Sequence, residues 1–142
     1  WDYLAGLIRE YNLLDVAHMI GSVADEALPR WMNACDVFAM PNREINGDNE
    51  GFGMVFIEAS ACGKPAVAGI AGGTRAAVLD GLTGFRVDGN RIEEVASALM
   101  KVLSDVAHAK QLGRAGHDRA HAQFSWERVA EATTKVIEEQ RE

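Results

Sequence analysis

The chain has 142 residues, of which 48% are hydrophobic and 25% charged, and its formal net charge is −7. This composition is ordinary for a globular protein, and the acidic balance argues against a general nucleic-acid binder or polybasic membrane attachment. Only two cysteines, Cys35 and Cys62, are present, which predicts reduced thiols in a cytoplasmic protein. Since the chain opens at Trp1 in a helical pattern, without an initiator methionine, we expect a piece of a longer protein.

The first part of the chain alternates predicted helices with predicted short strands. Apolar residues at helical spacing indicate the helices, and short apolar runs closed by glycine or proline indicate the strands. In chain order we expect a helix over residues 3–12, a strand over 16–20, a helix over 25–34 and a strand over 36–41. The polar residues 42–50 then form a loop with an Asn-Gly turn signal.

The rest of the chain continues this alternation and ends in three helices. Gly63 is expected to end a helix, Asn90 and Glu93 form a capping box, and Ser125 is a helix N-cap. In chain order we expect a helix ending at Ala61, a strand over 65–68, a helix over 74–79, a strand over 85–87, and helices after Asn90, over 107–122 and after Ser125.

The alternation predicts an α/β fold, with a parallel sheet of four strands and helices on both faces. The first and last of the three closing helices each carry an apolar stripe, as a core-facing helix does. The stripes are Ile92, Val95, Ala96, Leu99, Val102, Leu103 and Val106 in the first helix, and Trp126, Val129, Thr133 and Val136 in the last.

Two glycine-containing loops lie where such a sheet binds ligands, at the carboxyl ends of its strands. The first, Glu50-Gly51-Phe52-Gly53, opens a helix whose free N–H groups and positive dipole end form an anion site. The second runs from Gly69 through Gly72 and Gly73 to Thr74 and offers further backbone donors. Glycines let the backbone approach a ligand closely, although such pairs are also typical of plain turns.

Two glutamates accompany the first loop. Glu50 is a loop carboxylate, and Glu58 lies in the helix among apolar neighbours, where a mostly buried carboxylate needs a reason. One carboxylate could then serve each end of an elongated anionic ligand. The alternative for Glu58 is a solvated or capping side chain.

Other site chemistries fit the sequence poorly. The glycines at 69–73 lack the spacing of a dinucleotide-binding fingerprint. The cysteines are expected to be packing residues rather than nucleophiles, and the histidines to be surface residues without a metal-ligand pattern. These histidines are His18, His108, His117 and His121.

Residues 50–68, EGFGMVFIEASACGKPAVA, resemble the nucleotide-sugar signature of the family-4 retaining glycosyltransferases, which have the GT-B fold. Glu50 and Glu58 match the Glu-x7-Glu motif of that family. The segment from Pro41 through the Gly-Gly loop is most similar to mannosyltransferases that act on phosphatidylinositol mannosides. Further matches, in the family's order, are Ile20–Val23, Cys35–Phe38, Gly72-Gly73, Asp80–Phe85 and Phe124–Trp126.

The resemblance implies that residues 1–142 are a partial nucleotide-sugar-binding domain, Rossmann-like, with closing helices over 91–142. Its strands would correspond to the family's strands three to six. The beginning of the nucleotide-sugar-binding domain and a separate N-terminal acceptor-binding domain would precede Trp1. Any peripheral membrane association would be made only by that acceptor-binding domain. The donor would be a GDP-, UDP- or ADP-sugar, with no metal and no other cofactor.

The resemblance also implies roles for single residues. Glu50 would be the catalytic residue beside the donor sugar, and Glu58 would accept hydrogen bonds from both ribose hydroxyls. The family's phosphate-binding Arg and Lys would precede Trp1, and nothing in this chain replaces them. The sugar hydroxyls would be bound by backbone groups of Gly51, Phe52 and Gly53, and the diphosphate by those of Met54 and Val55. The base would meet the backbone near Val23, and the second loop would contact the donor through Gly72 and Gly73.

Two other functions stay open at this point. One is a noncatalytic nucleotide-binding or assembly module, and the other is a nucleotide-sugar epimerase or phosphorylase that shares the GT-B architecture. The Glu-x7-Glu pair favours hexosyl transfer, with mannosyl transfer first, over the epimerase or phosphorylase.

Overall fold

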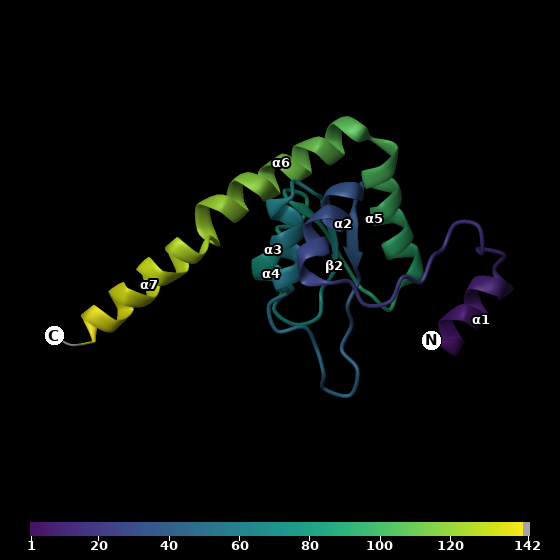
Figure 1. Ribbon diagram of the computed structural model, residues 1–142, viewed down its shortest axis with the longest axis horizontal. Coiled ribbons are helices and arrows are strands. Elements are labelled where there is room, and N and C mark those ends of the chain that lie inside the picture. Colours follow the sequence, from purple (N-terminus) through teal and green to yellow (C-terminus); the bar gives the residue numbers. More distant parts are fainter. Residues whose placement is uncertain (141–142) are drawn as a thin grey trace.

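The structure, a computed structural model, describes residues 1–140. A short sheet lies at its centre, with helices packed around it and one helix extending from each end of the body (Figure 1). The elements are α1 (Asp2–Glu10), the 3-10 helix η1 (Asp25–Ala27), α2 (Leu28–Ala34), β1 (Phe38–Met40), α3 (Met54–Ala61), β2 (Ala66–Gly69), α4 (Thr74–Ala77), β3 (Gly84–Val87), α5 (Ile92–Ser104), α6 (Val106–Gln123) and α7 (Trp126–Glu139).

The sheet has three parallel strands in the order β1-β2-β3, which confirms the predicted α/β class. The predicted fourth strand, over residues 16–20, is wrong. Val16 and Ile20 are exposed, and within residues 1–140 this segment pairs with no strand. An extended segment without a neighbour gains no ladder hydrogen bonds, so its apolar composition alone does not make it a strand.

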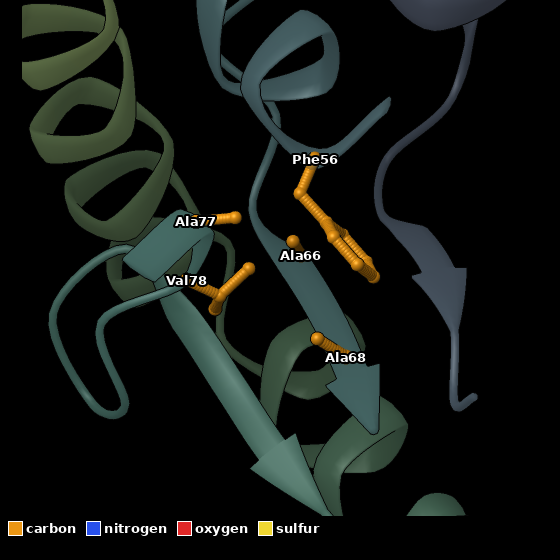
Figure 2. Close-up of a cluster of buried hydrophobic side chains, with 5 residues drawn as sticks. All are labelled: Phe56, Ala66, Ala68, Ala77 and Val78. Carbon is orange, nitrogen blue, oxygen red and sulfur yellow. The ribbon is translucent and has the colours of Figure 1, made fainter. Parts of the chain in front are cut away.

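Helices cover both faces of the sheet, as predicted. On one face, Phe56 of α3 and Val78 after α4 pack against Ala66 and Ala68 of β2, together with Ala77 (Figure 2). The opposite face is covered by α5 and α6 through a second buried cluster. The small side chains of β2 let the helices lie close to the strand. The start of α3 lies at the carboxyl edge of the sheet because the loop that follows β1 leads into it. The second cluster is Val67, Val87, Ala98, Val102 and Leu112.

The predicted apolar stripes are only partly buried. Of the stripe on α5, Val102 is buried, whereas Ile92 is 80% exposed. The stripe on α7 was expected in the core, and this is wrong: α7 buries no residue, and Trp126 is 77% exposed. The physical reason is visible in Figure 1, where α7 runs away from the body, so that only its start, at Trp126 and Val129, lies beside α3.

The helix ends follow the predicted caps in two of three cases. The Ser125 side chain accepts from the Arg128 N–H, and Gly63 adopts a φ of 70° two residues after the end of α3 at Ala61. The capping box at Asn90 is wrong, because Asn90 donates to the Asp88 carboxylate instead of capping α5.

Within residues 1–140, no helix is long and apolar enough to cross a bilayer.

Candidate functional site

The two glycine loops predicted from the sequence lie directly against one another at the carboxyl edge of the sheet. The Gly73 N–H donates to the Glu50 carbonyl oxygen over 2.8 Å. A Cβ added at Gly72 would collide with that same carbonyl group, and one at Gly73 would collide with the carbonyl of Gly51. The absence of side chains at these positions therefore permits the loops to touch and form one continuous backbone surface.

A third loop joins this surface through Asn42, which follows Pro41 just after the end of β1. Its side-chain oxygen accepts from the Gly69 N–H over 3.0 Å, and its side-chain nitrogen donates to the Ala71 carbonyl over 2.9 Å. Sequence reasoning missed this residue. The available signal was an amide side chain placed one residue after the proline that ends a strand, at the edge where ligand loops gather.

The second loop is also held by a hydrogen bond from the side chain of Thr74. Its hydroxyl is fully buried and donates to the Gly69 carbonyl over 2.6 Å. The loop from Gly69 to Gly73 is thus held at Gly69 by both Asn42 and Thr74, at Ala71 by Asn42, and in contact with Glu50 through Gly73. Such a surface is preorganised, which limits the conformational entropy that binding would cost.

Gly53 sets the start of α3. Its φ of 85° lies in the left-handed region, and an added Cβ would overlap the Phe56 ring. Both the backbone conformation and the Phe56 ring therefore disfavour any side chain at this position. The amides of Met54 and Val55 belong to the first helical turn, in which N–H groups lack intrahelical acceptors. Those amides and the helix dipole make this turn the part of the surface best suited to an anion.

Glu50 and Glu58 differ in their surroundings. Glu50 is half-buried at the loop contact, whereas Glu58 is exposed, so of the two possibilities left open for Glu58 the structure has the solvated side chain. The apolar neighbours of Glu58 pack inward while its own position on α3 faces outward, because Phe56 and Ala59 take the buried face. An exposed carboxylate stays hydrated in the folded protein, so folding carries no cost of removing water from it. It remains available to accept hydrogen bonds from a ligand.

Glu58 lies between two hollows. One, of about 510 Å³, lies between α3 and the η1–α2 segment and has Asp25 and Leu28 in its lining. The other, of about 410 Å³, is mostly apolar and lies between α3 and the start of α7, with Phe52 and Phe124 in its lining. Val23 is half-buried two residues before Asp25, but it does not line either hollow.

One arginine lies close to the second glycine loop. The Arg86 guanidinium donates to the Ile70 carbonyl over 3.4 Å, and its Nε is buried without a partner in the described part of the chain. This places a positive charge beside the loop surface, from a strand residue that sequence reasoning did not select.

Cys35 lies away from this surface, whereas Cys62 lines the hollow between α3 and the η1–α2 segment, together with Glu58. Cys35 lines a hollow of about 370 Å³ that also includes Gly63 and Lys64, near the amino ends of β1 and β2. Burial raises the pKa of the Cys35 thiol, so it is less reactive as a nucleophile than a free thiol at neutral pH. Both cysteines are free thiols, as expected from their number.

The histidines form no metal centre in the described structure. The rings of His117 and His121 have centroids 4.3 Å apart and planes tilted by 49°, on the exposed side of α6. No group of three or more His, Cys, Asp or Glu side chains suited to a metal ion is found among residues 1–140.

Comparison with known proteins places the chain in a family. Residues 2–119 match the family model described as glycosyl transferases group 1. A GDP-mannose-dependent alpha-(1-6)-phosphatidylinositol monomannoside mannosyltransferase of Mycobacterium tuberculosis is 39% identical over 131 residues, covering 91% of this chain and 34% of that protein. A D-inositol 3-phosphate glycosyltransferase of Actinosynnema mirum is 37% identical over 132 residues, covering 92% of this chain and 30% of that protein. The chain thus spans about a third of the length of these curated relatives.

Solved structures agree with the sequence relatives. Sucrose-phosphate synthase from Thermosynechococcus elongatus superposes with a TM-score of 0.84 at 33% identity, covering 96% of this chain and 33% of that one. Anabaena HepE, in complex with UDP-glucose, superposes with a TM-score of 0.86 at 26% identity, covering 97% of this chain and 36% of that one. These matches confirm the family and the GT-B-type α/β fold expected from the Glu-x7-Glu segment, and the chain belongs to the group 1 glycosyl transferases.

Proposed function

We propose that this chain is the nucleotide-sugar-binding part of a retaining, metal-independent hexosyltransferase. The observation that carries the proposal is the contact between the two glycine loops. Because the Gly73 amide bonds to the Glu50 carbonyl, the loop before α3, the start of α3 and the loop after β2 form one surface, with one carboxylate near each end. That is the arrangement an elongated diphosphate ligand with a sugar at each end would need.

In this proposal each part of the surface has a separate task. The amides of Met54 and Val55 bind the diphosphate, because the first turn of a helix presents free N–H groups and a positive dipole end. Glu58 accepts hydrogen bonds from the two ribose hydroxyls, and its exposure leaves both carboxylate oxygens available. The backbone near Val23 meets the base, on the same side of α3 as the hollow that Asp25 and Glu58 line.

The sugar end lies at the loop contact. Glu50, half-buried there, would be the catalytic residue beside the anomeric carbon. Departure of the nucleoside diphosphate is helped by fixed dipoles aimed at the developing charge, which is a strong form of electrostatic catalysis. The other sugar contacts would come from backbone amides of the two loops, at Gly51, Phe52, Gly53, Gly72 and Gly73.

The transferred sugar is proposed to be mannose, from GDP-mannose. The support comes from relatives: two of the most similar proteins are GDP-mannose-dependent mannosyltransferases, at 39% and 38% identity. A solved neighbour binds UDP-glucose instead, at 26% identity. The higher identity favours GDP-mannose, with UDP-glucose as the competing donor.

The acceptor and the working context are also proposals. Since the relatives are about three times as long as this chain, we propose that an N-terminal domain binds the acceptor and that the two parts work together. Residues 1–142 would then be a partial donor-binding domain. The two free cysteines support a cytoplasmic location.

The proposal is tested on the intact protein with a panel of GDP-mannose, UDP-glucose and ADP-glucose. Thermal shift and calorimetric titration measure binding, and NMR of the product reports the anomeric configuration with and without a metal chelator. Retained configuration from GDP-mannose, unaffected by chelator, is the expected result. Inversion would overturn the retaining assignment, and binding without transfer to any acceptor would favour a noncatalytic nucleotide-binding module.

A further inference from the structure

Arg119 joins parts of the molecule that the proposed donor site uses but that are far apart in sequence. It lies on α6, with its side chain directed at the carboxyl end of α4. One terminal nitrogen donates to the Ala76 carbonyl over 2.6 Å and the other to the Ala77 carbonyl over 3.0 Å. A planar guanidinium suits this task, because its fork satisfies two neighbouring carbonyls at once.

The same guanidinium stacks on an aromatic ring. Its central carbon lies 4.7 Å from the centre of the Phe124 ring, a distance typical of a cation–π contact. The Phe124 ring in turn packs on Phe52, with ring centres 5.8 Å apart and a 54° angle between the planes. Phe52 is part of the first glycine loop, two residues after Glu50.

These contacts close a ring. From Arg119, one arm passes through α4 to Gly73, whose amide bonds to the Glu50 carbonyl. The other arm passes through Phe124 to Phe52 and so returns to the first loop. Both arms meet at the loop contact. Arg119 therefore contacts both arms that lead to the loop contact.

Burial supports a fixed role for this side chain. Arg119 is half-buried, and burial lowers the pKa of its guanidinium, yet no carboxylate among residues 1–140 pairs with it. A partly desolvated cation without an ion partner needs its carbonyl and aromatic contacts, since leaving it unpaired would be costly. Arg114, five residues earlier on α6, is exposed and has no such contacts in the described structure, which makes it a matched control.

We propose that Arg119 is a positioning residue, which sets the spacing of the two glycine loops through α4 and Phe124 and thereby tunes donor affinity. The part about donor affinity rests on the proposed function. The part about loop spacing stands on its own contacts and has a readout that needs no ligand.

The first experiment measures amide hydrogen exchange in the intact protein, for segments 48–56 and 70–78, with 92–104 in α5 as the reference. Arg119→Gln should speed exchange in the two loop segments, Gly73 included, by about 3- to 10-fold, while α5 is unchanged. Arg119→Lys keeps the charge but not the fork, and should give an intermediate effect. Arg114→Gln should behave as wild type. Unchanged loops in Arg119→Gln, or equal acceleration in α5, would overturn the proposal.

The second experiment measures donor Kd by titration with GDP-mannose and UDP-glucose. We expect Arg119→Gln to raise Kd by about 3- to 10-fold, as is usual for coupled residues of one network. Phe124→Leu breaks only the aromatic arm. In the double variant Phe124→Leu with Arg119→Lys, the increase in the free energy of donor binding should be smaller than the sum of the two single increases. Additive effects would refute coupling through the ring. If wild type binds no nucleotide sugar, the proposed function fails, while the exchange result still decides the role of Arg119.

Discussion

The Gly73 amide donates a 2.8 Å hydrogen bond to the carbonyl oxygen of Glu50. This bond joins two loops that follow different strands, β1 and β2, at the carboxyl edge of the sheet. The bond uses the main chain on both sides, so its strength does not depend on which side chains the loops carry. It does depend on how closely the loops approach. Gly72 and Gly73 are the positions at which that approach is tightest.

Gly72→Ala should therefore destabilise the protein by more than its backbone conformation explains. Gly72 and Gly81 have nearly equal φ angles, 69° and 71°, but a Cβ at Gly81 meets nothing within 4 Å. We expect Gly81→Ala to cost about 1 kcal/mol from φ strain alone, and Gly72→Ala about 2–4 kcal/mol because overlap with Glu50 is added. Urea unfolding of both variants measures the difference. Equal costs would mean that the loops separate freely.

Glu58→Ala should weaken donor binding while the fold stays intact, since this side chain is exposed. Hydrogen bonds to a charged group contribute about 1.5–3 kcal/mol, which corresponds to a donor Kd about 10- to 100-fold higher. Inorganic diphosphate has no ribose and should lose much less. Glu93→Ala, an exposed glutamate of α5, is the charge-matched control. Equal losses for donor and diphosphate would rule out the ribose contact.

Thr74→Val should cost more stability than Thr74→Ser. Valine keeps the buried volume but leaves the Gly69 carbonyl without its 2.6 Å donor, at about 1–3 kcal/mol. Serine keeps the hydroxyl and loses one buried methyl group, at about 1 kcal/mol. Chemical denaturation ranks the two variants. A better tolerated valine would show that methyl packing, not the hydrogen bond, holds the second loop.

The Cys35 thiol makes stability depend on pH in the alkaline range. Burial raises its pKa in the folded protein, so the unfolded chain releases this proton first as pH rises. The contribution to stability is complete below the ordinary thiol pKa of about 8.5 and is lost as pH rises through the folded value. Urea unfolding between neutral pH and alkaline pH should show this loss in wild type but not in Cys35→Ser.

Alkylation checks the same shift without unfolding the protein. In a Cys62→Ser background only one thiol reacts, and its rate with iodoacetamide should reach half-maximum at a higher pH than in the denatured chain. A half-maximum at the same pH in both states would contradict the shift.

The sequence allowed the elements around the site to be predicted because their signals are local. Glycine before an apolar run indicated the start of α3 at Gly53, and strands alternating with helices indicated the parallel sheet. The contact between Glu50 and Gly73 could not be predicted, because it depends on how closely two loops pack in space. Asn42 and Arg119 were missed for the same reason: their partners are backbone groups far away in the sequence.

The wrong predictions also have a common cause. Residues 16–20 and the Trp126 face both carry apolar patterns that local rules assign to a strand and to the core. Neither pattern is completed by a neighbour within residues 1–140, so one segment lacks a strand partner and the other a covering surface. Periodicity specifies which side of an element is apolar, and tertiary contact decides whether that side is buried.

The extended position of α7 has a thermodynamic consequence. This helix of 14 residues buries none of them, and a helix of such length is marginal by itself in water. On warming the described chain, α7 should lose its helical circular dichroism before the sheet unfolds. The heat-capacity step that calorimetry records for this early transition should be small, because that step follows the apolar area newly exposed to water. The two methods should therefore give different midpoints, and a single two-state unfolding temperature would not describe this molecule.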